Sequence, residues 1–166
     1  GRITAWVVHD HRVALIRMNM ERLGVTIADV RTKDAAVDDA SLDEAFDAVL
    51  VDAPCSGLGT FARKPDVKYS KTPEDIVAIT RLQQSILDCC ANYVKKGGSL
   101  VYSTCTIMPE ENQEQIARFL SRRKDFHMDD LSAVLPFSKE RCERGLQLLP
   151  SEDGIEGFYI ARLVRS

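Results

Sequence analysis

Residues 47–57 read Asp-Ala-Val-Leu-Val-Asp-Ala-Pro-Cys-Ser-Gly, and this stretch decides the fold that the sequence predicts. Its apolar run ends at Asp52 and is typical of a strand buried on both faces; Cys55 follows directly. A second apolar run, 99–104, leads into Cys105 in the same way. Ligands of open α/β sheets bind outside the carboxyl ends of the strands. We therefore expect both thiols and the Asp52 carboxylate to converge in one cleft, where a covalent nucleophile would be placed.

Working outward, strands and helices alternate along the chain. Strands are predicted at 3–8, 26–31, 47–53, 99–104 and 158–164, with shorter apolar segments at 126–131 and 146–149. Helices are predicted from a cap at Asp10 to Gly24, from Thr72-Pro73 to Gly97-Gly98, and from Pro109 to Leu120. This alternation indicates an α/β fold, with a mostly parallel sheet and helices on both faces.

The composition of the chain limits the classes of protein to which it can belong. The 166 residues are 45% hydrophobic and 28% charged, which is typical of one globular domain, and we treat 1–166 as a single domain. The net charge of −3 gives no overall basic field for nucleic acid. No run is long enough to span a membrane. The five cysteines form neither a disulfide framework nor a zinc motif, so we expect a reducing, cytoplasmic location and no metal.

Five motifs in chain order carry a family resemblance. They are Asp52-Ala-Pro-Cys-Ser-Gly57, Arg63-Lys-Pro-Asp66, Tyr102-Ser-Thr-Cys-Thr106, Pro109-Glu-Glu-Asn112 and Gly157-Phe-Tyr-Ile-Ala-Arg162. With them the chain resembles the catalytic domain of the Sun/Fmu family of RNA (cytosine-5) methyltransferases. The resemblance implies a Rossmann-like methyltransferase fold, S-adenosylmethionine as cofactor, and RNA, specifically small-subunit rRNA, as substrate.

The resemblance also implies a role for each site residue. A cysteine thiolate adds to C6 of cytosine so that C5 can accept a methyl group, and Cys105 would be this nucleophile. Cys55 would help to release the product, and Asp52 would hold the base edge. Arg63 and Lys64 would contact the RNA. DNA cytosine-5 methyltransferases use the cysteine of a Pro-Cys motif as nucleophile, so the residue types alone leave Cys55 open for that role.

The cofactor residues depart from the family pattern. Asp34, Asp52 and Pro54 are the candidates for binding S-adenosylmethionine, with Asp34 near the adenine amino group. Val7 stands where the family has an acid that binds the ribose, and no Gly-rich loop precedes it. We therefore expect a catalytic domain that lacks its first strand and does not itself bind the cofactor.

The missing strand leads to a second hypothesis. Without it, two edges of a hydrophobic sheet would be exposed, and such edges promote self-association. The alternative to an enzyme is therefore a non-catalytic remnant, which folds and binds RNA or another copy but does not hold the cofactor.

Overall fold

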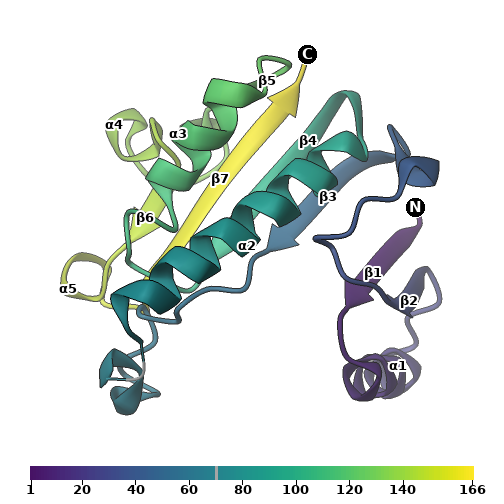
Figure 1. Cartoon of the computed structure of the whole chain (residues 1–166), viewed down its shortest axis with the longest axis horizontal. Helices are drawn as coiled ribbons and strands as arrows, with labels where there is room; N and C mark the ends of the chain where they lie inside the picture. Colours follow the sequence, from purple (N-terminus) through teal and green to yellow (C-terminus); the bar gives the residue numbers. More distant parts are fainter. Residues whose placement is uncertain (70) are drawn as a thin grey trace. The chain divides into compact units, whose positions relative to one another are not determined.

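The computed structural model describes residues 1–69 and 71–166, and the chain forms two compact units (Figure 1). Unit 1 covers Gly1–Asp38 and unit 2 covers Asp39–Ser166. None of the helices in the described part of the chain is long and apolar enough to cross a membrane.

Unit 1 is a strand–helix–strand motif. Strand β1 (Ile3–Val7) pairs in parallel with β2 (Ala28–Thr32), and helix α1 (Asp10–Leu23) connects them. Val13 of the helix and Val30 of β2 are buried. Unit 1 is thus a βαβ motif with a small core, and its connection is long enough for the crossover that parallel strands require.

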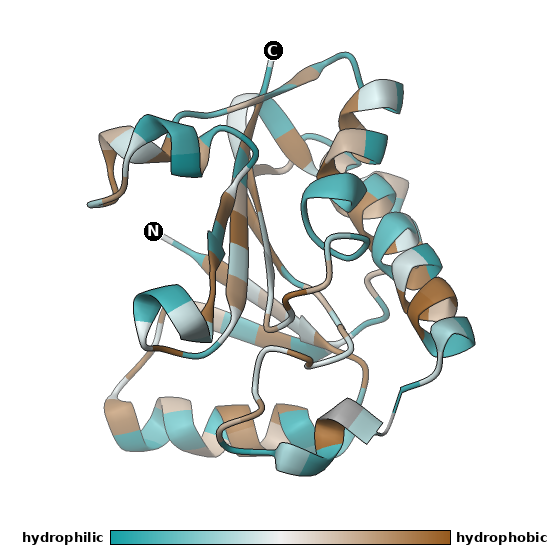
Figure 2. Cartoon of the chain, turned by 90° about the vertical axis from the view of Figure 1, so that its left-hand side faces the viewer, coloured by the Kyte–Doolittle hydropathy of each residue, from teal (hydrophilic) through white to brown (hydrophobic). Residues whose placement is uncertain are grey.

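The sequence predicted one end of α1 correctly and the other end wrongly. The helix stops at Gly24, whose φ of 67° is left-handed and suits glycine, as predicted. At the other end the prediction of an Asp10 cap is wrong, because His9 is the N-cap residue and Asp10 is the first helical residue. Asp10 instead accepts a hydrogen bond from the hydroxyl of Thr32. Apolar and polar residues alternate along the helix (Figure 2).

Unit 2 contains a five-stranded sheet. Its strands are β3 (Phe46–Asp52), β4 (Val94–Thr104), β5 (Phe126–Met128), β6 (Leu146–Leu148) and β7 (Phe158–Arg165). The order is β3-β4-β7-β5, with β6 also paired to β7. The β3–β4 pair is parallel, whereas β7 runs antiparallel to β4, β5 and β6. The predicted α/β class is confirmed, with the antiparallel strands at the C-terminal end of the chain.

The helices of unit 2 differ greatly in length. The longest are α2 (Pro73–Asn92) and α3 (Gln113–Arg122), followed by the short α4 (Lys139–Cys142) and α5 (Pro150–Asp153). Three short 3₁₀ helices are η1 (Ala40–Leu42), η2 (Pro65–Tyr69) and η3 (Leu131–Ala133).

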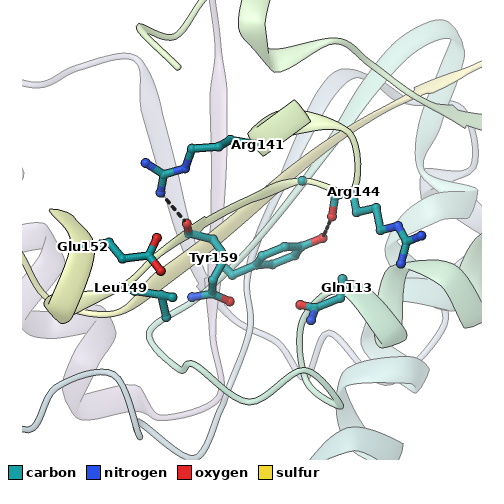
Figure 3. Close-up of a pocket in the computed structure, with 8 residues that line it drawn as sticks. Gln113, Arg141, Arg144, Leu149, Glu152 and Tyr159 are labelled. Carbon is teal, nitrogen blue, oxygen red and sulfur yellow. Dashed lines mark hydrogen bonds between the residues drawn. The ribbon is translucent and has the colours of Figure 1, made fainter. Parts of the chain in front are cut away.

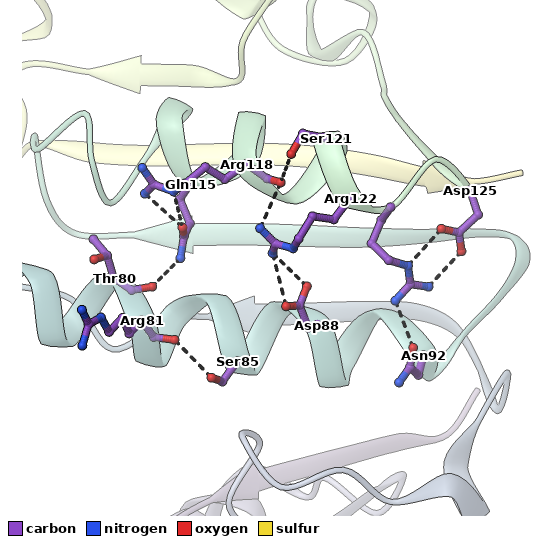
Figure 4. A network of polar contacts seen from close by, with 11 residues as sticks. Thr80, Arg81, Ser85, Asp88, Asn92, Gln115, Arg118, Ser121, Arg122 and Asp125 are labelled. Atoms are coloured by element: carbon purple, nitrogen blue, oxygen red, sulfur yellow. Dashed lines mark hydrogen bonds and ion pairs between the residues drawn. The ribbon is translucent and has the colours of Figure 1, made fainter.

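Helices α2 and α3 lie side by side and are joined by polar contacts (Figure 4). Gln115 donates to the carbonyl of Thr80 at 2.7 Å, and Arg122 forms an ion pair with Asp88 at 3.1 Å. Both helices and the sheet contribute almost fully buried apolar and aromatic side chains, among them Leu87 of α2, Phe119 of α3, Leu100 and Tyr102 of β4, and Leu163 of β7.

The start of α2 was predicted correctly and its end was not. Thr72 caps the helix in a reciprocal capping box with Asp75. The predicted stop at Gly97-Gly98 is wrong, because α2 ends at Asn92 and both glycines lie inside β4. The amide of Phe46 donates to the carbonyl of Tyr93 at 3.0 Å, so the chain already runs beside β3 there.

Two further expectations need correction. Helix α3 begins at Gln113 rather than Pro109, because residues 109–112 form a turn whose side chains bind elsewhere. Strand β3 is not buried on both faces: Val51 is buried, but Leu50 is 69% exposed. Within the described part of unit 2, β3 pairs only with β4, and α2 packs on it from one side, so its other face stays open.

Candidate active site

Two sulfur atoms meet where the parallel strands β3 and β4 end. The last residue of β3, Asp52, is paired with Ser103, and the amide of Ala53 donates to the Ser103 carbonyl at 2.9 Å. The two chains therefore leave the sheet side by side. Three residues beyond Asp52, the Sγ atom of Cys55 lies 3.2 Å from the Sγ atom of Cys105, and both cysteines are free thiols.

The loops that carry the cysteines are also joined by their backbones. The amide of Gly59 donates to the carbonyl of Cys105 at 3.0 Å, and the amide of Gly157 donates to the carbonyl of Gly59 at 2.9 Å. A Cβ atom on Gly59 would lie 2.1 Å from the Gly157 carbonyl oxygen, far inside contact distance. Glycine at position 59 is therefore required for this close approach.

The two thiols differ in their electrostatic environment. Burial, the hydrogen bond with Cys105 and the charge of Cys105 raise the pKa of Cys55 to about 12. Cys55 consequently keeps its proton at neutral pH, and in the contact between the two sulfur atoms either thiol can be the donor. A thiolate, rather than a thiol, is the reactive form of cysteine, so the raised pKa makes Cys55 less reactive than an ordinary cysteine.

Asp52 and Pro54 flank the thiols. The Asp52 side chain is exposed, and its Oδ1 atom accepts a hydrogen bond of 3.3 Å from the Ser103 hydroxyl. The carbonyl of Pro54 accepts from Nε2 of Gln83 at 3.0 Å, which fixes the turn between Asp52 and Cys55. An exposed carboxylate thus lies three residues from one thiol, with acceptor capacity left for a ligand.

Arg63 and Lys64 lie on the exposed turn that follows the Cys55 loop. The guanidinium of Arg63 binds both carboxylate oxygens of Glu156, and this hydrogen bonding raises the pKa of Arg63. The charge of Cys105 contributes in the same direction, more weakly, so the turn lies within electrostatic range of the candidate nucleophile. Lys64 is exposed, and its backbone amide donates to the carbonyl of Thr60 at 2.9 Å.

Asp34 and Val7 belong to unit 1. Asp34 is exposed, and its Oδ1 atom accepts a hydrogen bond of 2.9 Å from the amide of Ala36. Val7 ends β1 and offers only its backbone, whose carbonyl accepts from Lys33 at 3.1 Å. The Asp34 carboxylate can accept further hydrogen bonds, whereas the Val7 side chain cannot accept one.

Sequence reasoning missed the polar residues behind the cysteines. They are fully or almost fully buried: Ser56, Gln83, Thr106, Glu111 and Asn112. Glu111 and Asn112 were noted as part of a family motif, but acids after a proline are also typical of the first turn of a helix. Their burial depends on tertiary contacts. No local feature of the sequence distinguishes them from acids in the first turn of a helix.

A hollow of about 310 Å³ lies elsewhere in unit 2 (Figure 3). Arg141 on its wall pairs with Asp153 at 2.9 Å, and the hydroxyl of Tyr159 donates to the carbonyl of Arg144. Neither Cys55 nor Cys105 lines it. In the described part of the chain, no group of three or more His, Cys, Asp or Glu residues could hold a metal ion.

Solved structures with the same fold define the class of protein. The crystal structure of PH0851 matches with a TM-score of 0.91 and 31% identity, covering 99% of this chain and 37% of that one. A methyltransferase homologue from Pyrococcus horikoshii matches with a TM-score of 0.78 and 30% identity, covering 100% of this chain and 54% of that one. The fold is that of the S-adenosylmethionine-dependent methyltransferases.

The family follows from the sequence match. A family model described as "16S rRNA methyltransferase RsmB/F" matches residues 1–164, and the chain belongs to this family. A relative from Bacillus subtilis (strain 168), named "Probable ribosomal RNA small subunit methyltransferase B", is 44% identical over 167 residues. That match covers 98% of this chain and 37% of the relative, so the chain spans little more than a third of the relative's length. The resemblance inferred from the five motifs is confirmed.

Proposed function

We propose that this chain carries the catalytic residues of an S-adenosylmethionine-dependent methyltransferase that modifies C5 of cytosine in small-subunit rRNA. The observation that carries the proposal is the 3.2 Å contact between the sulfur atoms of Cys55 and Cys105 beside Asp52. The name of the Bacillus subtilis relative supports small-subunit rRNA as the substrate. Cysteine and carboxylate together suit chemistry on a base that is itself a poor nucleophile.

Cys105 starts the reaction in this proposal. Its thiolate forms a bond to C6 of cytosine, the C5–C6 double bond opens, and C5 becomes able to accept an electrophile. S-adenosylmethionine would supply the methyl group from its sulfonium and would leave as S-adenosylhomocysteine. The C5 proton then passes to a water molecule, its electron pair reforms the C5–C6 double bond, and the sulfur–C6 bond breaks to release the Cys105 thiolate. Cys55 assists this last step, because its S–H group touches the Cys105 sulfur and stabilises the departing thiolate.

The remaining site residues bind and orient. Asp52 holds the N3 and N4 edge of the base, where charge changes as the adduct forms. Asp34 would hold the adenine amino group of the cofactor, and Asp52 and Pro54 would line the cofactor near the reacting atoms. Arg63 and Lys64 would contact RNA phosphates, which fix the position of a nucleic acid without reading its sequence.

RNA that contains 5-fluorocytosine tests the proposal in the full-length protein with S-adenosylmethionine present, because after methylation the fluorine at C5 cannot leave as the proton does and the adduct is trapped. We expect a protein–RNA complex that survives a denaturing gel, and we expect Cys105→Ala to abolish it. Cys55→Ala should let a complex accumulate on ordinary RNA, since addition proceeds and release is slowed. Cys89→Ala, on α2, is the matched control and should behave as wild type. A complex that survives Cys105→Ala and is lost in Cys55→Ala would reverse the two roles.

A further inference from the structure

Glu111 is a fully buried carboxylate between the two cysteine loops, at 0% exposure. Its Oε2 atom accepts hydrogen bonds of 2.9 Å from the amide of Ser56 and 2.9 Å from Nε2 of Gln83. Its Oε1 atom accepts from the hydroxyl of Thr106 at 3.1 Å and from the hydroxyl of Ser56. A buried carboxylate is costly unless hydrogen bonds satisfy it, and here four donors do so.

These four bonds connect three separate segments of unit 2. Ser56 directly follows Cys55, Thr106 directly follows Cys105, and Gln83 lies on α2. The hydroxyls of Ser56 and Thr106 are also 2.9 Å apart. One side chain, Glu111, therefore sets the distance between the residues that follow the two thiols.

Asn112 fixes the Cys105 loop from the same side. Its Oδ1 atom accepts from the hydroxyl of Thr104 at 2.6 Å, and its Nδ2 group donates to the carbonyl of Thr106 at 3.0 Å. Both chain neighbours of Cys105 are thus held by buried polar groups. Cys105 itself lies between these anchored neighbours, is only partly buried, and contacts Cys55 through its sulfur atom.

We propose that Glu111 is a positioning residue, which holds the sulfur atoms of Cys55 and Cys105 in contact. The inference rests on the proposed function only in taking these thiols as the reacting groups. Its contribution is geometric rather than electrostatic. Glutamine at this position can still accept from the Ser56 amide and Gln83, and its NH₂ group can donate to the two hydroxyls, which accept as well as donate. Glu111→Gln should therefore keep the thiols together, whereas Glu111→Ala should not.

Phenylarsine oxide tests the geometry directly, because its arsenic forms bonds to two nearby thiols and releases one water molecule. The full chain is titrated, and peptide mass spectrometry assigns the bridge to Cys55 and Cys105. In Glu111→Ala, affinity should fall by at least about tenfold, since capture depends on the effective concentration of the second thiol. Glu111→Gln should stay within about twofold, well below the tenfold that 1.4 kcal/mol represents. Glu110→Ala changes the exposed neighbouring acid and should match wild type.

Folding is checked by circular dichroism before each titration. If Glu111→Ala does not fold, the Ser56→Ala variant is used instead. It removes one hydroxyl that is bonded to Glu111 and should also weaken the capture of phenylarsine oxide. Wild-type capture in folded Glu111→Ala, or in Ser56→Ala where only that variant folds, would overturn the proposal. A loss in Glu111→Gln equal to that in Glu111→Ala would overturn it too, because charge would then be responsible.

The rate of the adduct links this test to the reaction. With 5-fluorocytosine RNA and S-adenosylmethionine, in the full-length protein, Glu111→Ala should slow adduct formation by about a hundredfold, as a small misplacement of a reacting group does. RNA affinity should stay unchanged, and Glu111→Gln should restore the rate. Arsenical capture needs neither RNA nor cofactor. Weakened capture in Glu111→Ala, with no adduct from wild type, would therefore support the positioning role and overturn the proposed function alone.

Discussion

The segments that follow the two cysteines start alike and continue in opposite directions. After Cys55 the chain turns outward into an exposed loop that carries Arg63 and Lys64. After Cys105 it turns inward, where Thr106 and Glu111 are completely buried. The inward segment can fix the position of a thiol, whereas the outward one can meet a large ligand. Similar sequence contexts thus lead into one exposed loop and one buried turn.

Removing each thiol is the most severe test of this comparison. Cys105→Ala should lower methyl transfer to small-subunit rRNA by at least about ten-thousandfold, in the range found when covalent enzymes lose their nucleophile. Cys55→Ala should retain the methylation of one equivalent of RNA but release it slowly. Transfer of labelled methyl from S-adenosylmethionine by the full-length protein, followed over the first turnover and at steady state, measures both. Equal losses in the first turnover would remove the distinction between the two segments.

Asp52 tests whether the end of β3 takes part in the chemistry. Asp52→Asn keeps the size of the side chain but loses its charge, so single-turnover methylation should slow by at least about a hundredfold. Asp47→Asn is the matched control on the same strand, because Asp47 is exposed near the other end and pairs with Lys95 at 2.8 Å. Near-normal rates in Asp52→Asn would leave this carboxylate as a structural end of the strand.

Alkylation measures the difference between the thiols without any substrate. The pKa of Cys55 is about 12 against an ordinary value of 9.0, so at pH 8 its thiolate fraction is lowered by about a thousandfold. Iodoacetamide should therefore modify Cys55 very slowly. In Cys105→Ala the side-chain hydrogen bond and the charge of Cys105 are lost, and burial is the one remaining cause that raises the pKa of Cys55, so Cys55 should react at least about tenfold faster. Unchanged labelling of Cys55 in that variant would mean that burial alone sets its pKa.

The same raised pKa predicts a pH effect on stability. Between pH 9 and about 12 the folded protein keeps the Cys55 proton and the unfolded chain does not. The free energy of unfolding should therefore fall as the pH rises through this range. Urea denaturation at several pH values should show a shallower loss in Cys55→Ala than in wild type, and parallel curves would contradict the assignment.

The sequence could predict the local features of the site better than its long-range contacts. Apolar runs that end at Asp52 and Thr104 fix where β3 and β4 stop, and parallel pairing then places both cysteines at one edge. The Thr72 cap was equally predictable, because a capping box is a local pattern. These features depend on residues that are close in the chain.

Features that depend on distant residues were not predictable. Glu111 is buried because Ser56, 55 residues earlier, donates to it. Arg63 pairs with Glu156, 93 residues later, and no pattern near either residue indicates this. The register that makes Val94 part of β4 likewise comes from its pairing with Phe46. Such contacts form only when the sheet assembles, so a local pattern cannot report them.

The smallest expected effect concerns the exposed turn that carries Arg63 and Lys64. It tests whether the segment after Cys55 binds RNA. Lys64→Ala should reduce the salt slope of RNA binding by about 0.7, the value for one phosphate contact to a single strand. Arg63→Ala should change it less, because Arg63 already binds Glu156 in the absence of RNA. Binding of a small-subunit rRNA fragment is measured at several salt concentrations, with Lys124→Ala, beyond the end of α3, as the control. If Lys64→Ala leaves the slope unchanged while first-turnover chemistry slows, the outward segment serves catalysis, and the division between the two segments fails.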